Sequence, residues 1–168
     1  KLVILGAQEG WMAATELAKA DVPVIVDARL NLPNSFSEIG ATLQNAARMD
    51  AAGVRVMFMP ASDDPAQYAR TITQVAGNAV ANGMPWAHAL AAITKVPAEV
   101  WGIGDSYGTL DPGKDADIVV WDGDPLEVTS APTAVLIKGK NIPLVSRQTA
   151  LQERYKNLSD KTMPFAYR

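Results

Sequence analysis

The chain contains no cysteine and only one histidine, His88, among its 168 residues. Without cysteine it forms neither disulfides nor thiolate ligands and nucleophiles. This absence fits a cytoplasmic protein and an exported bacterial protein equally well, so the localisation stays open. A single imidazole without a second histidine or cysteine is more typical of a helix surface or a packing position than of a metal site.

The sequence also lacks an excess of one charge and any long apolar run. Fifteen basic and 18 acidic residues give a formal net charge of -3, without a run of either sign. Nucleic-acid and anionic-membrane binding usually leave a basic patch, and no stretch approaches the roughly 20 apolar residues that span a bilayer. We therefore expect neither nucleic acid nor membrane as a partner. No signal peptide is visible, but the chain starts at Lys1 inside an apolar stretch, and we expect the natural N-terminus to lie upstream.

What is present is the composition of a globular core, with 48% hydrophobic and 20% charged residues. Apolar periodicity in the first part predicts three strands that alternate with three helices. Ile39 and Met49 are expected on the buried face of the second helix, and Tyr68 and Val75 on that of the third. Strand-helix units in series predict parallel strands joined by right-handed crossovers. The expected strands are residues 1–5, 22–26 and 54–59, and the expected helices are residues 9–19, 36–52 and 65–82.

The second part of the chain changes to shorter elements. Two short helices are expected to meet at residues 95–97, because Pro97 ends one helix and suits the first turn of the next. Asp111-Pro112-Gly113 predicts a tight turn. Strands are expected at residues 117–122 and 134–138, with a hairpin partner at 142–145, followed by an exposed helix over 147–157 and an aperiodic tail.

Residues 89–125 carry a resemblance to a known family. ALAAIT is followed by Pro97-Ala98, by GIGD, and then by GTLDPGKDADIVVWDGDP up to Pro125. This ordered set resembles the C-terminal end of the amidohydrolase superfamily, with imidazolonepropionase-like and dipeptidase-like members the most similar. In that family the segment leads from a (β/α)8 barrel into a small β-sandwich beside it.

The resemblance implies an α/β fold that consists of the last three strand-helix units of a TIM barrel plus the C-terminal part of the adjoining β-sandwich. The implied parts are a partial barrel with its following helices (1–104), a β-sandwich segment (105–146) and a C-terminal helix with a tail (147–168). A closed barrel needs eight strands and about 250 residues. We therefore expect a fragment that is inactive alone, and whose open edges are covered by the remainder of the same chain or by a homo-oligomer.

Chemistry in such barrels lies on the loops that follow the carboxyl ends of the strands. This rule selects Gln8 after the first strand, Asp27 and Arg29 after the second, and Asp63 and Asp64 after the third. Gln8, Asp27 and Arg29 are candidates for the substrate-facing side, and Asp63 and Asp64 are catalytic candidates. Each has a structural alternative: Gln8 can cap the following helix, Asp27 and Arg29 can pair with each other, and Asp63 and Asp64 precede Pro65 as N-cap residues.

By resemblance, the family's metal ligands are histidines after the first, fifth and sixth barrel strands and an aspartate after the eighth. This chain reads Leu5-Gly6-Ala7-Gln8 where the sixth-strand histidine is expected, and an ungapped match puts Ala61 in place of the aspartate. We assign no metal ligand to these residues; a divalent metal such as zinc is expected only in a full-length protein. Two hypotheses remain: a hydrolase of amide, cyclic amide or peptide C-N bonds, with a small molecule or peptide as substrate, and a non-catalytic binding or scaffold protein that has lost its ligands.

Overall fold

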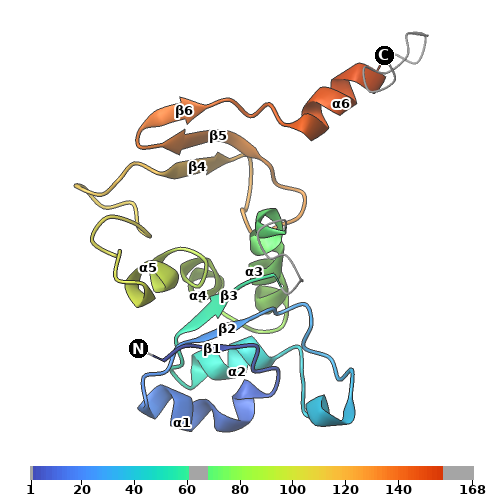
Figure 1. The fold of residues 1–168 in the computed structure, drawn as a ribbon, viewed down its shortest axis with the longest axis vertical. Helices are drawn as coiled ribbons and strands as arrows, with labels where there is room; N and C mark the ends of the chain where they lie inside the picture. The colour runs from blue at the N-terminus through green and yellow to red at the C-terminus, as the bar shows by residue number, and fades with distance from the viewer. Residues whose placement is uncertain (1, 61–67, 157–168) are drawn as a thin grey trace.

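A computed structural model describes residues 2–60 and 68–156. These residues form a mixed α/β fold with two sheets of three strands each. Figure 1 shows the first sheet with α1 and α2 along it, the helices α3, α4 and α5 between the two sheets, and α6 extending away from the second sheet. No helix in the described ranges is long and apolar enough to cross a membrane.

The first sheet is parallel, as the repeated strand-helix units predict. Its strands β1 (Ile4–Leu5), β2 (Val24–Val26) and β3 (Val56–Phe58) lie side by side in the order of the chain. Neighbouring parallel strands need a crossover connection, and a helical segment supplies each one. The first crossover holds η1 (Gly10–Ala13) and α1 (Ala14–Lys19), the second holds η2 (Phe36–Glu38) and α2 (Asn45–Ala51), and β3 is followed in the described residues by η3 (Ala69–Thr71) and α3 (Ile72–Ala81).

The two faces of this sheet differ in how well they are covered. Val24 and Val26 are at most 1% exposed and belong to the main hydrophobic core, which the helices share. Side chains alternate along a strand, so the paired residues Leu5, Ile25 and Met57 occupy the opposite face. Met57 is 2% exposed there, whereas Leu5 is 63% exposed. The second face is therefore covered at β3 and open at β1.

The expected continuous helix over residues 36–52 is wrong. The structure has a short 3-10 turn, η2, and then α2, which begins only at Asn45. Between them Gly40 makes its backbone hydrogen bonds elsewhere: its N–H donates to Glu9 Oε1 at 2.6 Å, and its carbonyl accepts from Trp11 Nε1 at 2.8 Å. A helix would use those two groups internally, so these tertiary bonds interrupt it. Ile39, expected on the buried face, is 72% exposed, whereas Met49 is fully buried as expected.

The other helices differ less from the expected positions and buried faces. The short helices are α4 (Trp86–Ala91) and α5 (Lys95–Val100), so Pro97 is the third residue of α5 and does not mark its start. Tyr68, expected to face inward, is 44% exposed, while Val75 is fully buried as expected. His88 lies on the exposed side of α4 with Nδ1 2.8 Å from Asp50 Oδ2. The structure thus places this histidine in a surface pair between two helices.

The second sheet is antiparallel and joins β4 (Ile118–Trp121), β5 (Pro132–Ile137) and β6 (Lys140–Ile142) in chain order. The expected return strand at 142–145 was placed too late. The hairpin turns at Lys138 and Gly139, which have φ angles of 49° and 74°. Two successive residues with positive φ match the tight two-residue turns that join antiparallel strands, so β6 starts directly at Lys140.

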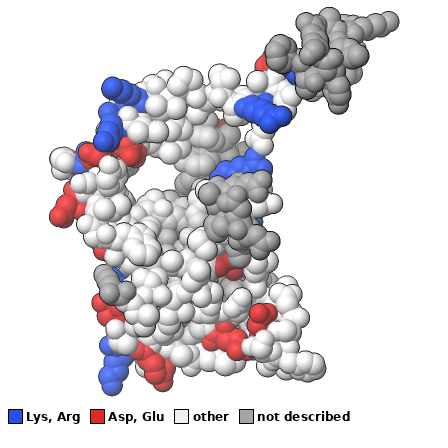
Figure 2. All heavy atoms as spheres, in the orientation of Figure 1, with Lys and Arg blue, Asp and Glu red and all other residues white. Residues whose placement is uncertain are grey.

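The helix α6 (Arg147–Tyr155) begins at Ser146 with a capping box, in which Ser146 and Thr149 exchange side-chain bonds with each other's backbone N–H groups. As expected, its residues are exposed. Several large apolar side chains of the second sheet are also uncovered, including Val119, Val120 and Ile137. Figure 2 shows acidic and basic side chains dispersed over one face of the molecule, with a wide uncharged area in its middle.

Candidate functional site

The carboxyl end of β2 carries a buried carboxylate that holds an arginine in one orientation. Asp27 follows β2 directly, and its side chain is 2% exposed, whereas that of Arg29 is 30% exposed. Nε of Arg29 donates to Asp27 Oδ1 at 3.0 Å and Nη2 donates to Oδ2 at 2.7 Å, and the backbone N–H of Arg29 donates to Oδ1 at 2.9 Å. Such a paired fork is among the strongest side-chain interactions in proteins. The structure therefore brings these two predicted residues together.

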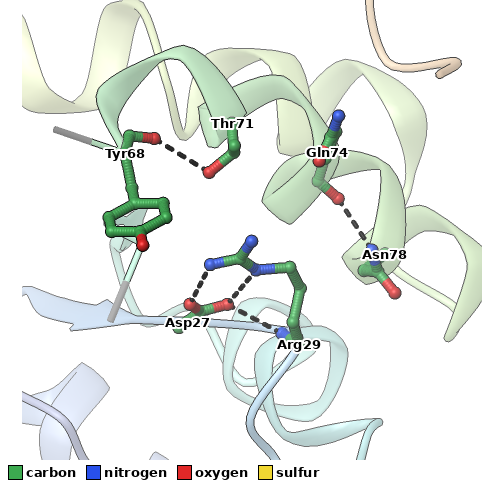
Figure 3. Close-up of polar contacts among 6 residues, drawn as sticks. All are labelled: Asp27, Arg29, Tyr68, Thr71, Gln74 and Asn78. Atoms are coloured by element: carbon green, nitrogen blue, oxygen red, sulfur yellow. Dashed lines mark hydrogen bonds and ion pairs between the residues drawn. The ribbon is translucent and has the colours of Figure 1, made fainter. Parts of the chain in front are cut away.

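This interaction also sets the electrostatics of the pair. The side-chain hydrogen bond to Asp27 raises the pKa of Arg29 above its ordinary value, against a smaller opposing effect of burial and with further help from the negative charge. Arg29, like other arginines, is cationic throughout the physiological pH range. In Figure 3 its guanidinium faces Asp27 on one side and is turned toward the segment of η3 and α3 that carries Tyr68, Thr71 and Gln74.

Gln8 lies in the loop after β1, whose backbone adopts an unusual shape. Gly6 has a φ of 98° and Ala7 a φ of 48°, a left-handed conformation that residues with a Cβ rarely adopt. Asn45, which is fully buried, stabilises this loop from α2: its Nδ2 donates to the carbonyl of Ala7 at 2.9 Å, and its Oδ1 accepts from the backbone N–H of Trp11 at 2.9 Å. Backbone strain of this kind concentrates at functional sites and persists only where neighbouring groups enforce it.

The neighbouring Glu9 does not cap the helix that follows it. It occupies the N-cap position of η1 without a side-chain capping bond, and its carboxylate instead accepts the N–H of Gly40. The loop after β1 is thereby tied both to α2 and to the segment that follows β2. The loops after β1 and β2 both follow the carboxyl ends of their strands, and the side chains of Glu9 and Asn45 hold these segments in place relative to each other.

The two predicted catalytic residues, Asp63 and Asp64, lie outside the described residues. The rule that selects Asp27 and Arg29 also selects Asn31 in the same loop, whereas Asn45 was not predicted; both asparagines are at most 1% exposed. An asparagine among the apolar positions of an amphipathic helix was the available signal for Asn45, since buried amides need specific partners.

These residues do not by themselves make a metal site. Within residues 2–60 and 68–156, no three His, Asp or Glu side chains lie close enough together to hold a metal ion. In the loop after β1, Gly6 and Ala7 have no ligand atoms in their side chains, the carbonyl of Ala7 accepts from Asn45, and the carboxylate of Glu9 accepts the N–H of Gly40. A metal bound near this edge would require ligands from outside the described ranges.

Comparisons with known proteins agree with this geometry. A solved structure of an amidohydrolase from Thermotoga maritima MSB8 is 30% identical with a TM-score of 0.75, and the match covers 85% of this chain and 37% of that one. A prolidase structure complexed with N-methylphosphonate-L-proline shares the fold at 20% identity and a TM-score of 0.59, over 84% of this chain and 40% of that one. The amidohydrolase tasK of Hapsidospora irregularis is 44% identical over 78 residues, which are 46% of this chain and 8% of that protein.

The chain therefore spans well under half the length of these relatives. A protein-family model described as "Amidohydrolase family" matches residues 5–148, from β1 to the start of α6. This match includes both sheets, the loops with Gln8, Asp27 and Arg29, and every helix between them. On that evidence the chain belongs to the amidohydrolase family.

Proposed function

We propose that these residues are the C-terminal part of an amidohydrolase that hydrolyses a C-N bond in an amide, a cyclic amide or a small peptide. The observation that carries this proposal is the family match over residues 5–148. In such a reaction the oxygen of water forms a bond to the carbonyl carbon, the C-N bond breaks, and the nitrogen leaves with a proton.

In this proposal β1, β2 and β3 are the sixth to eighth strands of a (β/α)8 barrel, and β4 to β6 belong to the adjoining β-sandwich. Three features support this arrangement. The three parallel strands follow one another in chain order, the face around Leu5 is open, and the match with the Thermotoga protein covers only 37% of its length. The remainder of the same chain would cover that face and pair with β1; a second copy of the chain is the alternative occupant.

The residues at the carboxyl ends of the strands would form one side of the substrate site. Asp27, Arg29 and Gln8 lie on loops of this edge, where the sites of parallel barrels are found. If the full-length protein uses a divalent metal, as its family suggests, its ligands would come mainly from the preceding strands. Asp63 and Asp64 remain catalytic candidates for the loop after β3.

A non-catalytic binding or scaffold role is the second candidate. It is favoured by Gly6 and Ala7, which stand where the resemblance to the family leads one to expect a histidine ligand. A barrel with this substitution can keep its shape while losing a ligand.

Purified full-length protein, expressed in metal-rich medium, separates the two roles. We expect stoichiometric bound metal and chelator-sensitive hydrolysis of at least one member of a panel of dipeptides, N-acyl amino acids and cyclic amides. Protein with neither bound metal nor turnover would contradict the hydrolase and support the scaffold. Residues 1–168 alone serve as the control and should be inactive.

A further inference from the structure

We propose that Arg29 binds a carboxylate of the substrate, so that the preferred substrates are amides with a free carboxylate, such as peptides with an unblocked C-terminus or N-acyl amino acids. This inference rests on the proposed hydrolase function and adds the substrate class. Its basis is the way in which Asp27 presents the guanidinium at the carboxyl end of β2.

Asp27 uses only some of the N–H donors of the Arg29 guanidinium. An arginine side chain carries five N–H groups, and Asp27 engages one on Nε and one on Nη2. Within residues 2–60 and 68–156, no side chain or carbonyl accepts a hydrogen bond from Nη1. The three remaining N–H groups include a second fork of the geometry that matches the two oxygens of a carboxylate.

Of the two partners, the arginine is the one that solvent can reach. The carboxylate of Asp27 is 2% exposed while the arginine side chain is 30% exposed, so the negative group is buried and the positive group is the accessible one. Asp27 also fixes the guanidinium plane before any ligand arrives, which reduces the entropy lost on binding.

The side-chain amide of Asn31 is a second donor on the same loop, and it favours a ligand with several hydrogen-bond acceptors. Asn31 is 1% exposed, and among the described residues its Nδ2 finds no hydrogen-bond partner. A buried donor without a partner costs about 1–3 kcal/mol, so such groups in folded proteins are usually explained by a missing acceptor. The loop after β2 thus holds two sets of donors, on Arg29 and on Asn31, for which the described part of the chain supplies no acceptor.

An arginine at the amino ends of the same strands provides a control. Arg55 directly precedes β3, and its Nη2 lies 2.7 Å from Oδ1 of Asp21. Its side chain is 27% exposed, close to the 30% of Arg29. Its partner is more exposed, at 76% for Asp21 against 2% for Asp27. Since Arg55 lies at the amino ends of the strands, replacing it removes an arginine of similar exposure without touching the proposed site.

The test compares Arg29→Met, Arg29→Lys and Arg55→Met in the full-length protein, with dipeptides and the corresponding dipeptide C-terminal amides as substrates. Wild-type protein should prefer the free carboxylates. Hydrogen bonds to charged groups are worth about 1.5–3 kcal/mol, so Arg29→Met should lower kcat/KM for the carboxylates about 10- to 150-fold, mainly through KM. The amides should change less than about 3-fold. Arg29→Lys should recover part of the loss, and Arg55→Met should leave the preference unchanged.

Three results would overturn the inference: a wild-type protein that hydrolyses both substrate types equally, an equal loss on both in Arg29→Met, or an equal change of preference in Arg55→Met. Each leaves the hydrolase function intact. If no substrate is turned over, the hydrolase proposal fails, and calorimetric titration with the dipeptides then decides about Arg29. Carboxylate-dependent binding that Arg29→Met abolishes supports its role, and binding without that dependence, or no binding, overturns it.

Discussion

Replacing Gly77 with alanine is expected to destabilise the protein by about 1–3 kcal/mol, the usual range for overpacking. Gly77 lies in the middle of α3, where a Cβ would be 2.3 Å from the backbone carbonyl oxygen of Leu126. Leu126 is 6% exposed and part of the main core, so its carbonyl cannot simply turn aside. In a helix without such a contact the same change stabilises by roughly 0.5–1 kcal/mol, so the sign of the effect is diagnostic.

The segment that would have to move is held at two points. The N–H of Leu126 donates to Asp124 Oδ1 at 2.9 Å, and Trp86 Nε1 on α4 donates to the same carboxylate. Denaturant unfolding of Gly77→Ala measures the effect, with Gly104→Ala as the control. At Gly104 the nearest contact of a new Cβ is an ordinary 3.5 Å to Glu99 Cγ, so little change is expected. An unchanged or raised free energy of unfolding in Gly77→Ala would show that Leu126 does not pack against α3 as described.

Asn45→Ala is expected to lower the free energy of unfolding by about 2–4 kcal/mol. The change removes two hydrogen bonds from a fully buried side chain and leaves a small cavity, and both the N–H of Trp11 and the carbonyl of Ala7 lose a partner. It should also release Ala7 from its left-handed conformation. Denaturant unfolding measures the first effect, and faster amide exchange at Trp11 in the native state reports the second.

The adjacent Gln44 provides the control for this experiment. It is exposed, and its Oε1 only accepts a bond from Arg48 Nη2 at 2.8 Å, so Gln44→Ala should change stability by less than about 0.5 kcal/mol. If Asn45→Ala were as mild as Gln44→Ala, the loop after β1 would not depend on α2 for its shape. The candidate site would then lack the support assigned to it.

The sequence was sufficient for features that depend on local pattern. Strands β2 and β3 follow from short apolar runs. The segment around Gly40 could not be predicted in the same way. Its backbone groups bond to Glu9 and Trp11, about 30 positions away in the chain, and no local periodicity records such partners.

In the candidate site, too, some residues were predicted from local pattern and others became evident only from the structure. Asp27 and Arg29 were predicted because the carboxyl end of a parallel strand is a known location for chemistry. The structure shows that they pair with each other, as their structural alternative expects. Asn45 supports the loop of Gln8 from 38 positions beyond Ala7, a relation that only the folded chain shows. Periodicity alone indicates three parallel strand-helix units, and the prediction that they belong to a barrel comes from the family resemblance.

The most direct test of this account is amide hydrogen exchange at Leu5 in the full-length protein. Ile4 and Gly6 donate their backbone N–H groups to β2, to Pro23 and Ile25 respectively, so the N–H of Leu5 between them points away from β2. If β1 is an inner strand of a barrel completed by the preceding chain, Leu5 should be protected to the same degree as Ile4 and Gly6. Exchange of Leu5 at the rate of an unprotected peptide amide, while its two neighbours stay protected, would show that β1 is a true edge and would contradict the account.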